Sequence, residues 1–221
     1  TIDLKKYCGL HETIVIANPN APTSLLAPVA AIEEVLRTNP DNIVVVDETY
    51  VEFAPAGSSC LPLLEKYENL VITHTFSKTH NLAGARLGYC IARPGLITDM
   101  NRVKFSYSPY NVNSMTQAAG TAAIRDEAYF HEVTAKLLAT RTAATEGLRQ
   151  RGFTVFDSAA NFLFATTDHM PCKEIFEKLR AQGILIRHFN APRISNYLRI
   201  TIGTDAEMQR FFAALDEILG A

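Results

Sequence analysis

Apolar residues in the first half of the chain form short runs. Thr13–Ala17, Ile43–Asp47 and Leu70–Thr75 are rich in isoleucine, valine or both, and polar or turn-forming residues flank them. Such runs are typical of strands covered on both faces of a sheet. Pro28–Thr38 lies between the first two runs and has the apolar spacing of a helix. We therefore expect an α/β fold with a mostly parallel sheet.

Two later segments depart from this alternation. Leu87–Ala92 follows the preceding run too closely for a helical crossover, so we expect it to pair antiparallel to a neighbouring strand. Residues 114–150 are rich in alanine and contain no proline and, apart from Gly120 and Gly147, no glycine. This composition favours a long helix, which we expect to connect two domains.

The pattern after Gly152 is strand, strand, helix, strand, strand, helix. Pro171 suits the first turn of its helix and Gly183 suits the exit from it. The expected elements are Phe153–Phe156, Asn161–Ala165, Pro171–Gln182, Ile184–Arg187, Tyr197–Ile202 and Asp205–Leu219. The predicted organisation is a partial large α/β domain over residues 1–115, a connecting helix over 116–150 and a small C-terminal α+β domain over 151–221.

Composition narrows the function classes. The chain has 221 residues, 48% of them hydrophobic, which is enough for a sizeable core. A formal net charge of -2 gives no basic field, so we do not expect nucleic acid as a partner. No run approaches the roughly 20 apolar residues that span a bilayer, and the first residues lack the apolar core of a signal peptide. The cysteines show no paired spacing, so we expect reduced thiols, no metal site and a cytoplasmic protein.

The run Thr73–Gly88 contains the strongest chemical signal. Lys78 follows the end of a predicted strand, where the loops of open α/β sheets bind ligands. A lysine amine that loses its proton attacks aldehydes to form Schiff bases. Thr75, Ser77 and Arg86 surround it in sequence and supply donors for a phosphate group. A plain surface lysine is the alternative interpretation.

A second candidate site lies at the end of the preceding predicted strand. Asp47 ends a strongly apolar run, and Tyr50 follows three residues later. A carboxylate in this position can pair with the protonated nitrogen of a bound pyridine ring. The tyrosine hydroxyl can donate a hydrogen bond to an oxygen substituent of the same ring. Asp47 could instead cap a turn, as aspartate often does.

Short motifs follow one another along the chain. They are Asn18–Ser24, Asp47-x-x-Tyr50, Ser77-Lys78 with Arg86, Tyr110–Ser114 and Leu198–Thr204. The first three together resemble the fold-type I pyridoxal-phosphate aminotransferases. The last two resemble the histidinol-phosphate aminotransferase group most closely. The similarity extends over essentially the whole chain.

This resemblance implies a cofactor and a set of residues that bind it. Pyridoxal 5′-phosphate would attach to Lys78, which would also move the proton during catalysis. Asp47 would hold the ring nitrogen and Tyr50 the ring 3-oxygen, while the phosphate would lie against Thr75, Ser77 and Arg86. Family members usually read Asn-Pro-Thr-Gly where this chain reads Ala21-Pro22-Thr23-Ser24. The asparagine contact therefore cannot be transferred to Ala21, and Asn18 or Asn20 is the candidate to replace it.

Two arginines are candidates for substrate binding. Arg199 matches the family arginine that binds the α-carboxylate of the amino acid, and Arg187 matches an additional anion-binding position in the histidinol-phosphate group. Arginine binds carboxylate and phosphate through paired hydrogen bonds. Pairing of Arg199 with an acidic neighbour is the alternative.

The resemblance also predicts a reaction and an assembly. It implies transamination between histidinol phosphate or imidazole acetol phosphate and glutamate or 2-oxoglutarate, in histidine biosynthesis, by a homodimer. The family's upstream arm, phosphate-binding turn and ring-stacking aromatic residue have no counterpart here, so we expect the C-terminal part of a longer enzyme. An aromatic-amino-acid aminotransferase, a pyridoxal-dependent decarboxylase of a phosphorylated amino acid, and a non-catalytic fragment that binds only cofactor or a partner stay open.

Overall fold

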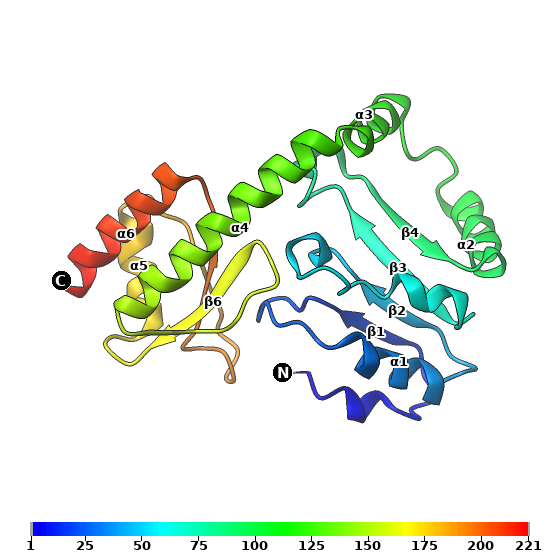
Figure 1. Cartoon of the computed structure of the whole chain (residues 1–221), viewed down its shortest axis with the longest axis horizontal. Helices are drawn as coiled ribbons and strands as arrows, with labels where there is room; N and C mark the ends of the chain where they lie inside the picture. The colour runs from blue at the N-terminus through cyan, green and yellow to red at the C-terminus, as the bar shows by residue number, and fades with distance from the viewer. Residues whose placement is uncertain (1, 221) are drawn as a thin grey trace. The chain divides into compact units, whose positions relative to one another are not determined.

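The computed structural model describes residues 2–220 and divides them into two compact units (Figure 1). The first unit holds the described residues up to Asn20 together with Leu26–His131. The second unit holds Ala21–Leu25 and residues 132–220. The boundary after His131 falls inside helix α4 (Glu127–Gln150), which contributes residues to both units.

A mixed sheet forms the centre of the first unit. Its strands are β1 (Ile14–Ala17), β2 (Val44–Asp47), β3 (Leu70–Thr75) and β4 (Gly88–Ala92), in the order β1-β2-β3-β4. The first three strands are parallel, and β4 runs antiparallel to β3. The predicted mostly parallel sheet and its antiparallel last strand are both confirmed.

One face of this sheet is covered by helix α1 (Val29–Thr38) and by the 3-10 turns η1 (Leu4–Tyr7) and η3 (Leu61–Glu65). Alternation along β1 places Ile14 and Ile16 in the core beneath these elements. Val15 points to the opposite face and is 67% exposed. The expectation that the strands are covered on both faces is therefore wrong for β1 in this chain.

A buried carboxylate ties a loop to the edge of the sheet where β2 ends. Glu48 is 1% exposed and accepts hydrogen bonds from the hydroxyl of Ser59 (2.7 Å) and from the backbone N–H of Cys60. His74 Nε2 lies 3.3 Å from the same carboxylate. Burial, and then the charge of Glu48, raise the pKa of the Cys60 thiol to about 12. This thiol therefore stays protonated well above neutral pH.

The segment after β4 is helical. Helix α2 (Pro94–Tyr107) was not predicted, because none of its residues is buried and its apolar positions show no clear helical stripe. The helix expected over residues 114–150 is divided in two at Asp126, into α3 (Ser114–Arg125) and α4. The side chain of Asn113 caps α3 by accepting a hydrogen bond from the N–H of Thr116 at 2.9 Å. The remaining short turns are η2 (Val51–Phe53) and η4 (Ala83–Ala85).

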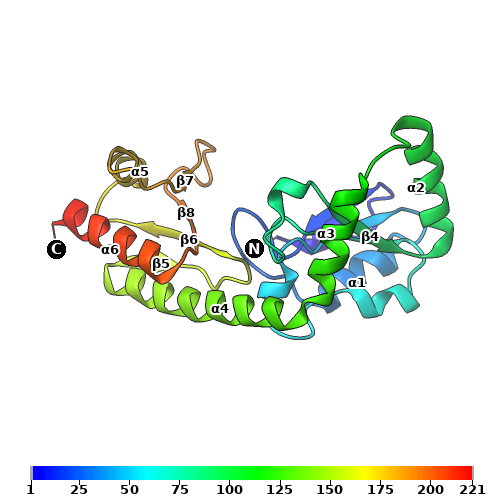
Figure 2. The ribbon, with the colours of Figure 1, turned by 90° about the horizontal axis from the view of Figure 1, so that it is seen from above.

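The second unit is a small antiparallel sheet covered by helices. Its strands are β5 (Phe153–Val155), β6 (Phe162–Thr167), β7 (Arg187–His188) and β8 (Leu198–Thr201), in the order β5-β6-β8-β7. Its helices are α5 (Cys172–Ala181), α6 (Asp205–Leu219) and the second part of α4. Figure 2 shows α6 alongside α4, where Arg151 pairs with Asp216.

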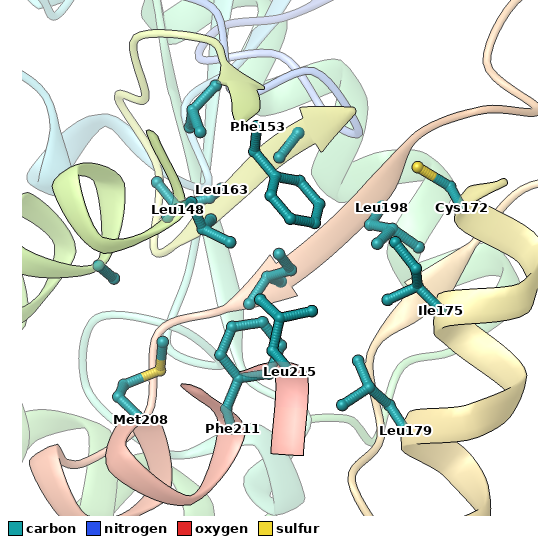
Figure 3. Packing of buried hydrophobic residues seen from close by; sticks show 14 of the residues in the cluster. Leu148, Phe153, Leu163, Cys172, Ile175, Leu179, Leu198, Met208, Phe211 and Leu215 are labelled. Atoms are coloured by element: carbon teal, nitrogen blue, oxygen red, sulfur yellow. The ribbon is translucent and has the colours of Figure 1, made fainter. Parts of the chain in front are cut away.

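Alternate residues of the central strands point into the core of this unit. Leu163 on β6 and Leu198 and Ile200 on β8 pack against the apolar faces of the helices, as Figure 3 shows for Leu163 and Leu198. Their neighbours Phe164 and Arg199 lie on the opposite face of the sheet. The strand expected over Ile184–Arg187 is wrong in its bounds, because its ladder with β8 contains only residues 187 and 188.

None of the helices within residues 2–220 is both long and apolar enough to cross a membrane.

The core of the second unit predicts a matched pair of stability changes. Leu198 is 1% exposed in the core, whereas Leu185 is 78% exposed. We expect Leu198→Ala to lower the free energy of unfolding by about 2–5 kcal/mol, because it removes buried methyl groups and leaves a cavity. Leu185→Ala should change the same quantity by less than about 0.5 kcal/mol. Urea unfolding followed by circular dichroism measures both, and equal losses would contradict the packing described.

The buried thiol predicts a pattern of alkylation. Thiolates react with iodoacetamide and thiols do not. At pH 9 in the folded chain we expect half-buried Cys8 and Cys90 to be modified while Cys60 is spared, since its pKa is raised to about 12. Peptide mass mapping gives the result, and alkylation in urea is the control, where every cysteine should react. Rapid modification of Cys60 in the folded chain would contradict the closed loop over Glu48.

Candidate active site

The lysine loop, residues 76–87, connects β3 to β4 and is closed at its base. Thr75 and Gly88 are register partners across the two strands. Just beyond them the N–H of Phe76 donates to the carbonyl of Leu87 at 3.1 Å. The N–H of Ser77 donates to the hydroxyl of Thr75 at 3.1 Å and turns the chain away from the sheet. The chain therefore leaves β3 in a defined turn just before Lys78.

Lys78 lies between two residues that fix the loop. Phe76 and Thr79 are 4% and 7% exposed, whereas Lys78 is exposed. Within residues 2–220, no acidic side chain lies within ion-pair distance of the Lys78 ammonium group. The loop thus presents an accessible amine on a backbone that its neighbours hold in place.

The predicted phosphate-binding residues lie in this loop or at its base. Arg86 has a left-handed backbone with φ of 53°, and its Nη1 donates to the carbonyl of Ala83 at 3.0 Å. Its guanidinium is exposed, which leaves other N–H groups for a ligand. Thr75 and Arg86 flank opposite ends of the lysine loop, and Ser77 precedes Lys78. Ser77, Lys78 and Arg86 therefore lie in the closed loop, and Thr75 lies at its base on β3.

Asp47 lies at the end of β2, the strand beside β3. Its register partner on β3 is Thr73. Asp47 Oδ1 accepts hydrogen bonds from Thr49 N (3.1 Å), Thr49 Oγ1 (2.6 Å) and Thr73 Oγ1 (3.2 Å). No group within residues 2–220 donates a hydrogen bond to Oδ2. Because β2 and β3 are parallel, Asp47 and the start of the lysine loop lie at the same edge of the sheet.

The two remaining predicted cofactor residues extend from the same edge. Tyr50 is half-buried at the start of η2, three residues after Asp47. Asn18 follows β1 and is 1% exposed; its N–H donates to the carbonyl of Asp47 at 3.0 Å. Both ends of its side-chain amide bond the backbone of Ala27, at 2.8 and 3.2 Å. Asn18 thus fixes the backbone beside Asp47, and its role as a cofactor ligand stays a prediction.

The predicted substrate arginines are direct neighbours in the second unit. Arg187 on β7 and Arg199 on β8 are register partners, so their side chains share one face of the sheet. Arg199 Cζ lies 5.1 Å from the ring centroid of Phe162, and Arg187 Cζ lies 5.8 Å from that of Phe189. Neither guanidinium forms an ion pair with an acidic residue in the part of the chain that the structure describes. Pairing of Arg199 with an acidic neighbour is therefore not what the structure shows.

Arg199 also has an unsatisfied buried donor. Its Nε is buried and has no hydrogen-bond partner among the described residues. A buried N–H without an acceptor costs free energy, so natural proteins seldom leave one without a reason. Two adjacent cations, one with an unused donor, form an arrangement suited to an anionic ligand.

Some polar contacts of the site were not predicted from the sequence. Thr49 lies two residues after Asp47, which is the spacing of an aspartate turn and could have been recognised. The contact from Thr73 requires the strand register, and the pair of buried Glu48 with His74 requires the fold. No group of three or more His, Cys, Asp or Glu residues within 2–220 is placed to hold a metal ion.

Comparison with known proteins assigns the chain to a family. A family model described as "Aminotransferase class I and II" matches residues 2–215. Histidinol-phosphate aminotransferase from Brachyspira hyodysenteriae is 42% identical over 219 residues, which are 99% of this chain and 62% of that protein. The chain therefore spans about three-fifths of the length of such curated relatives.

Two solved structures with a similar fold are a complex with pyridoxal-5′-phosphate and a decarboxylase. Histidinol-phosphate aminotransferase from Sinorhizobium meliloti, solved in complex with pyridoxal-5′-phosphate, has a TM-score of 0.85 at 29% identity over 94% of this chain and 57% of that one. L-threonine-O-3-phosphate decarboxylase from Porphyromonas gingivalis has a TM-score of 0.75 at 26% identity over 95% of this chain and 65% of that one. From the match over nearly its whole length, this chain belongs to the aminotransferase class I and II family.

Proposed function

We propose that this chain supplies the lysine-bearing part of a pyridoxal-phosphate-dependent aminotransferase for histidinol phosphate. The reaction would interconvert histidinol phosphate and imidazole acetol phosphate with glutamate and 2-oxoglutarate as the other pair, in histidine biosynthesis. The observation that supports it best is the accessible Lys78 amine in a closed loop beside the strand that ends at Asp47. The names of the relatives support the choice of substrate.

The residues present fit the proposed cofactor. Asp47 has one carboxylate oxygen saturated by three donors and the other without a donor within residues 2–220. That second oxygen is suited to accept a hydrogen bond from a protonated ring nitrogen. The lysine loop contains an exposed amine for the aldehyde and hydroxyl and guanidinium donors for the phosphate. These groups match the aldehyde, the ring nitrogen and the phosphate of pyridoxal phosphate.

When bound, pyridoxal phosphate supplies an aldehyde for the substrate amine and a ring that withdraws electrons from the reacting carbon. The chain's own residues do the remaining work. Lys78 Nζ would take a proton from the substrate carbon that bears the amine and deliver it to the carbon of the cofactor's aldehyde group. Asp47 holds the ring nitrogen in its protonated form, and Tyr50 donates its hydroxyl to the ring oxygen. Thr75, Ser77 and Arg86 bind the phosphate and so fix the orientation of the ring.

Arg187 and Arg199 are proposed to bind the acidic groups of the substrates. Their guanidiniums lie on one face of the second unit, and Arg199 has an unused buried donor. One half-reaction brings a tetrahedral phosphate and the other a planar carboxylate. Arginine binds both oxyanions through paired hydrogen bonds. One fixed pair of cations therefore serves both substrates.

We further propose that the protein works as a homodimer in the cytoplasm. Apolar side chains of α2 and α3 support the assembly, because Val103, Phe105 and Met115 are 68%, 60% and 82% exposed. Large apolar side chains exposed in this way favour burial against another polypeptide.

A decarboxylase of a phosphorylated amino acid is the second candidate. The solved threonine-phosphate decarboxylase supports it, and the same lysine, aspartate and arginines would serve that reaction. An aromatic-amino-acid aminotransferase would use them as well. Rates with histidinol phosphate, threonine phosphate and phenylalanine separate the three. Since the chain spans about three-fifths of its relatives, a fragment that binds cofactor without turnover is the remaining alternative.

Borohydride reduction tests the proposed cofactor attachment. With pyridoxal phosphate added to the purified chain, we expect reduction to leave a pyridoxyl group on Lys78 alone, because its loop places phosphate donors beside the amine. Peptide mass mapping identifies the modified residue. Lys78→Ala should abolish the adduct, while Lys104→Ala, which removes an exposed lysine of α2, should not. Labelling spread over many lysines, or unchanged in Lys78→Ala, would contradict the proposal.

The arginine pair predicts a loss of affinity for oxyanions. We expect Arg199→Ala and Arg187→Ala each to weaken binding of histidinol phosphate by about 10- to 100-fold, since each removes charged hydrogen bonds. Isothermal titration calorimetry on the cofactor-loaded chain measures this. The matched control is Arg193→Ala, an exposed arginine in the same unit that lies outside the two strands. Equal losses in all three variants would show a general charge effect and contradict the assigned roles.

A further inference from the structure

The aspartate clamp consists of Thr49 and Thr73, whose hydroxyls both donate to Asp47 Oδ1. We infer that these threonines are positioning residues, which turn Oδ2 of Asp47 toward the ring nitrogen of the cofactor. The inference rests on the proposed function and adds to it the device that sets the orientation of this carboxylate.

The geometry of the clamp is one-sided. Thr49 Oγ1 lies 2.6 Å and Thr73 Oγ1 3.2 Å from Oδ1, and the N–H of Thr49 adds a third donor at 3.1 Å. An ionised carboxylate accepts hydrogen bonds on both oxygens. Here all three are on Oδ1, and none of the residues in the described range donates to Oδ2. The two oxygens of a carboxylate are equivalent, so what the three donors fix is the plane of the group, with one oxygen held by the protein and the other left for a ligand.

The two donors come from different parts of the sheet. Thr49 belongs to the turn that follows β2, while Thr73 belongs to β3 at the register position of Asp47. Parallel neighbours in register direct their side chains to the same face, so the hydroxyl of Thr73 approaches Asp47 from the side. Threonine is branched at Cβ and stiff about χ1, which limits where each hydroxyl can lie. Donors from two directions fix the carboxylate more firmly than either alone.

The backbone around the clamp is itself held. The N–H of Glu48 donates to the carbonyl of Thr73 at 2.9 Å, and the N–H of Asn18 donates to the carbonyl of Asp47 at 3.0 Å. The three strand ends therefore cannot separate without breaking main-chain hydrogen bonds. Valine in place of either threonine would keep the shape and the strand preference while removing only the hydroxyl.

The test compares two ligands. One is pyridoxal phosphate, and the other is an analogue in which a carbon atom replaces the ring nitrogen. Both keep the aldehyde and the phosphate, so only the contact with Asp47 differs. Dissociation constants are measured by absorbance titration for the chain, for Thr49→Val and Thr73→Val, and for Thr49→Ser and Thr73→Ser. Asp47→Asn is the reference for complete loss of the contact, and urea unfolding confirms that each variant folds.

We expect the unmodified chain to bind pyridoxal phosphate more tightly than the analogue. Each valine variant should bind pyridoxal phosphate about three- to tenfold more weakly and the analogue with unchanged affinity. The serine variants, which restore the hydroxyl, should recover most of the difference.

The other outcomes would contradict either the positioning role of the threonines or the proposed function. Valine variants that weaken both ligands equally would assign the threonines a structural role only, and valine variants with no effect would remove any role in binding. Either result would leave the proposed function intact. An unmodified chain that does not discriminate between the ligands would instead overturn the role of Asp47, and one that binds neither would overturn the proposed cofactor of this chain.

Discussion

The alignment of three parallel strand ends is the constraint on which the rest of the first unit depends. Ala17, Asp47 and Thr73 occupy one row across β1, β2 and β3. Parallel strands bring their carboxyl ends to one edge, and the turns that follow them must share the space at that edge. A shift of one residue in any strand would send its side chains to the opposite face and remove the carboxylate from its donors.

That edge combines rigid and accessible groups. Buried side chains such as Phe76 and Glu48 hold the backbone, while Lys78 and Arg86 extend from it. The arrangement agrees with the general rule that sites are more precise when a rigid scaffold positions the loops that bind the ligand. The second unit follows the same rule differently. Its helices cover one face of the sheet and leave Arg199 on the other.

Much of the fold could be predicted from the sequence because burial and local pattern agree there. The isoleucine- and valine-rich runs became β1, β2 and β3, and the span of α6 matched the prediction, with Thr204 and Glu207 forming a capping box at its start. Helix α2 could not be predicted, because none of its apolar residues is buried and its pattern is weak. Contacts between residues far apart in the sequence could not be predicted either. Ala21–Leu25 belongs to the second unit, where the carbonyl of Ser24 accepts a hydrogen bond from Ala159.

The site was predictable in its residue types and less so in its contacts. Lys78 and Asp47 could be chosen because each follows an apolar run at the place where ligand loops begin. The hydroxyl of Thr73 could not, since an interior strand residue acquires a partner only when the register is known. Arg187 and Arg199 could be chosen as candidates, but their direct pairing could not, because they are twelve residues apart in the chain and become neighbours only through the register of the sheet.

The pairing of Arg187 with Arg199 has a consequence for the stability of the folded second unit. Like charges directly opposite one another on antiparallel strands repel, and no acidic side chain in the described range compensates for these two. An anion that binds between them relieves the repulsion, and any ligand that binds only the folded form also stabilises it by mass action. If the proposed oxyanion binds between the two guanidiniums, resistance of the second unit to unfolding and proteolysis should therefore rise with the concentration of that anion.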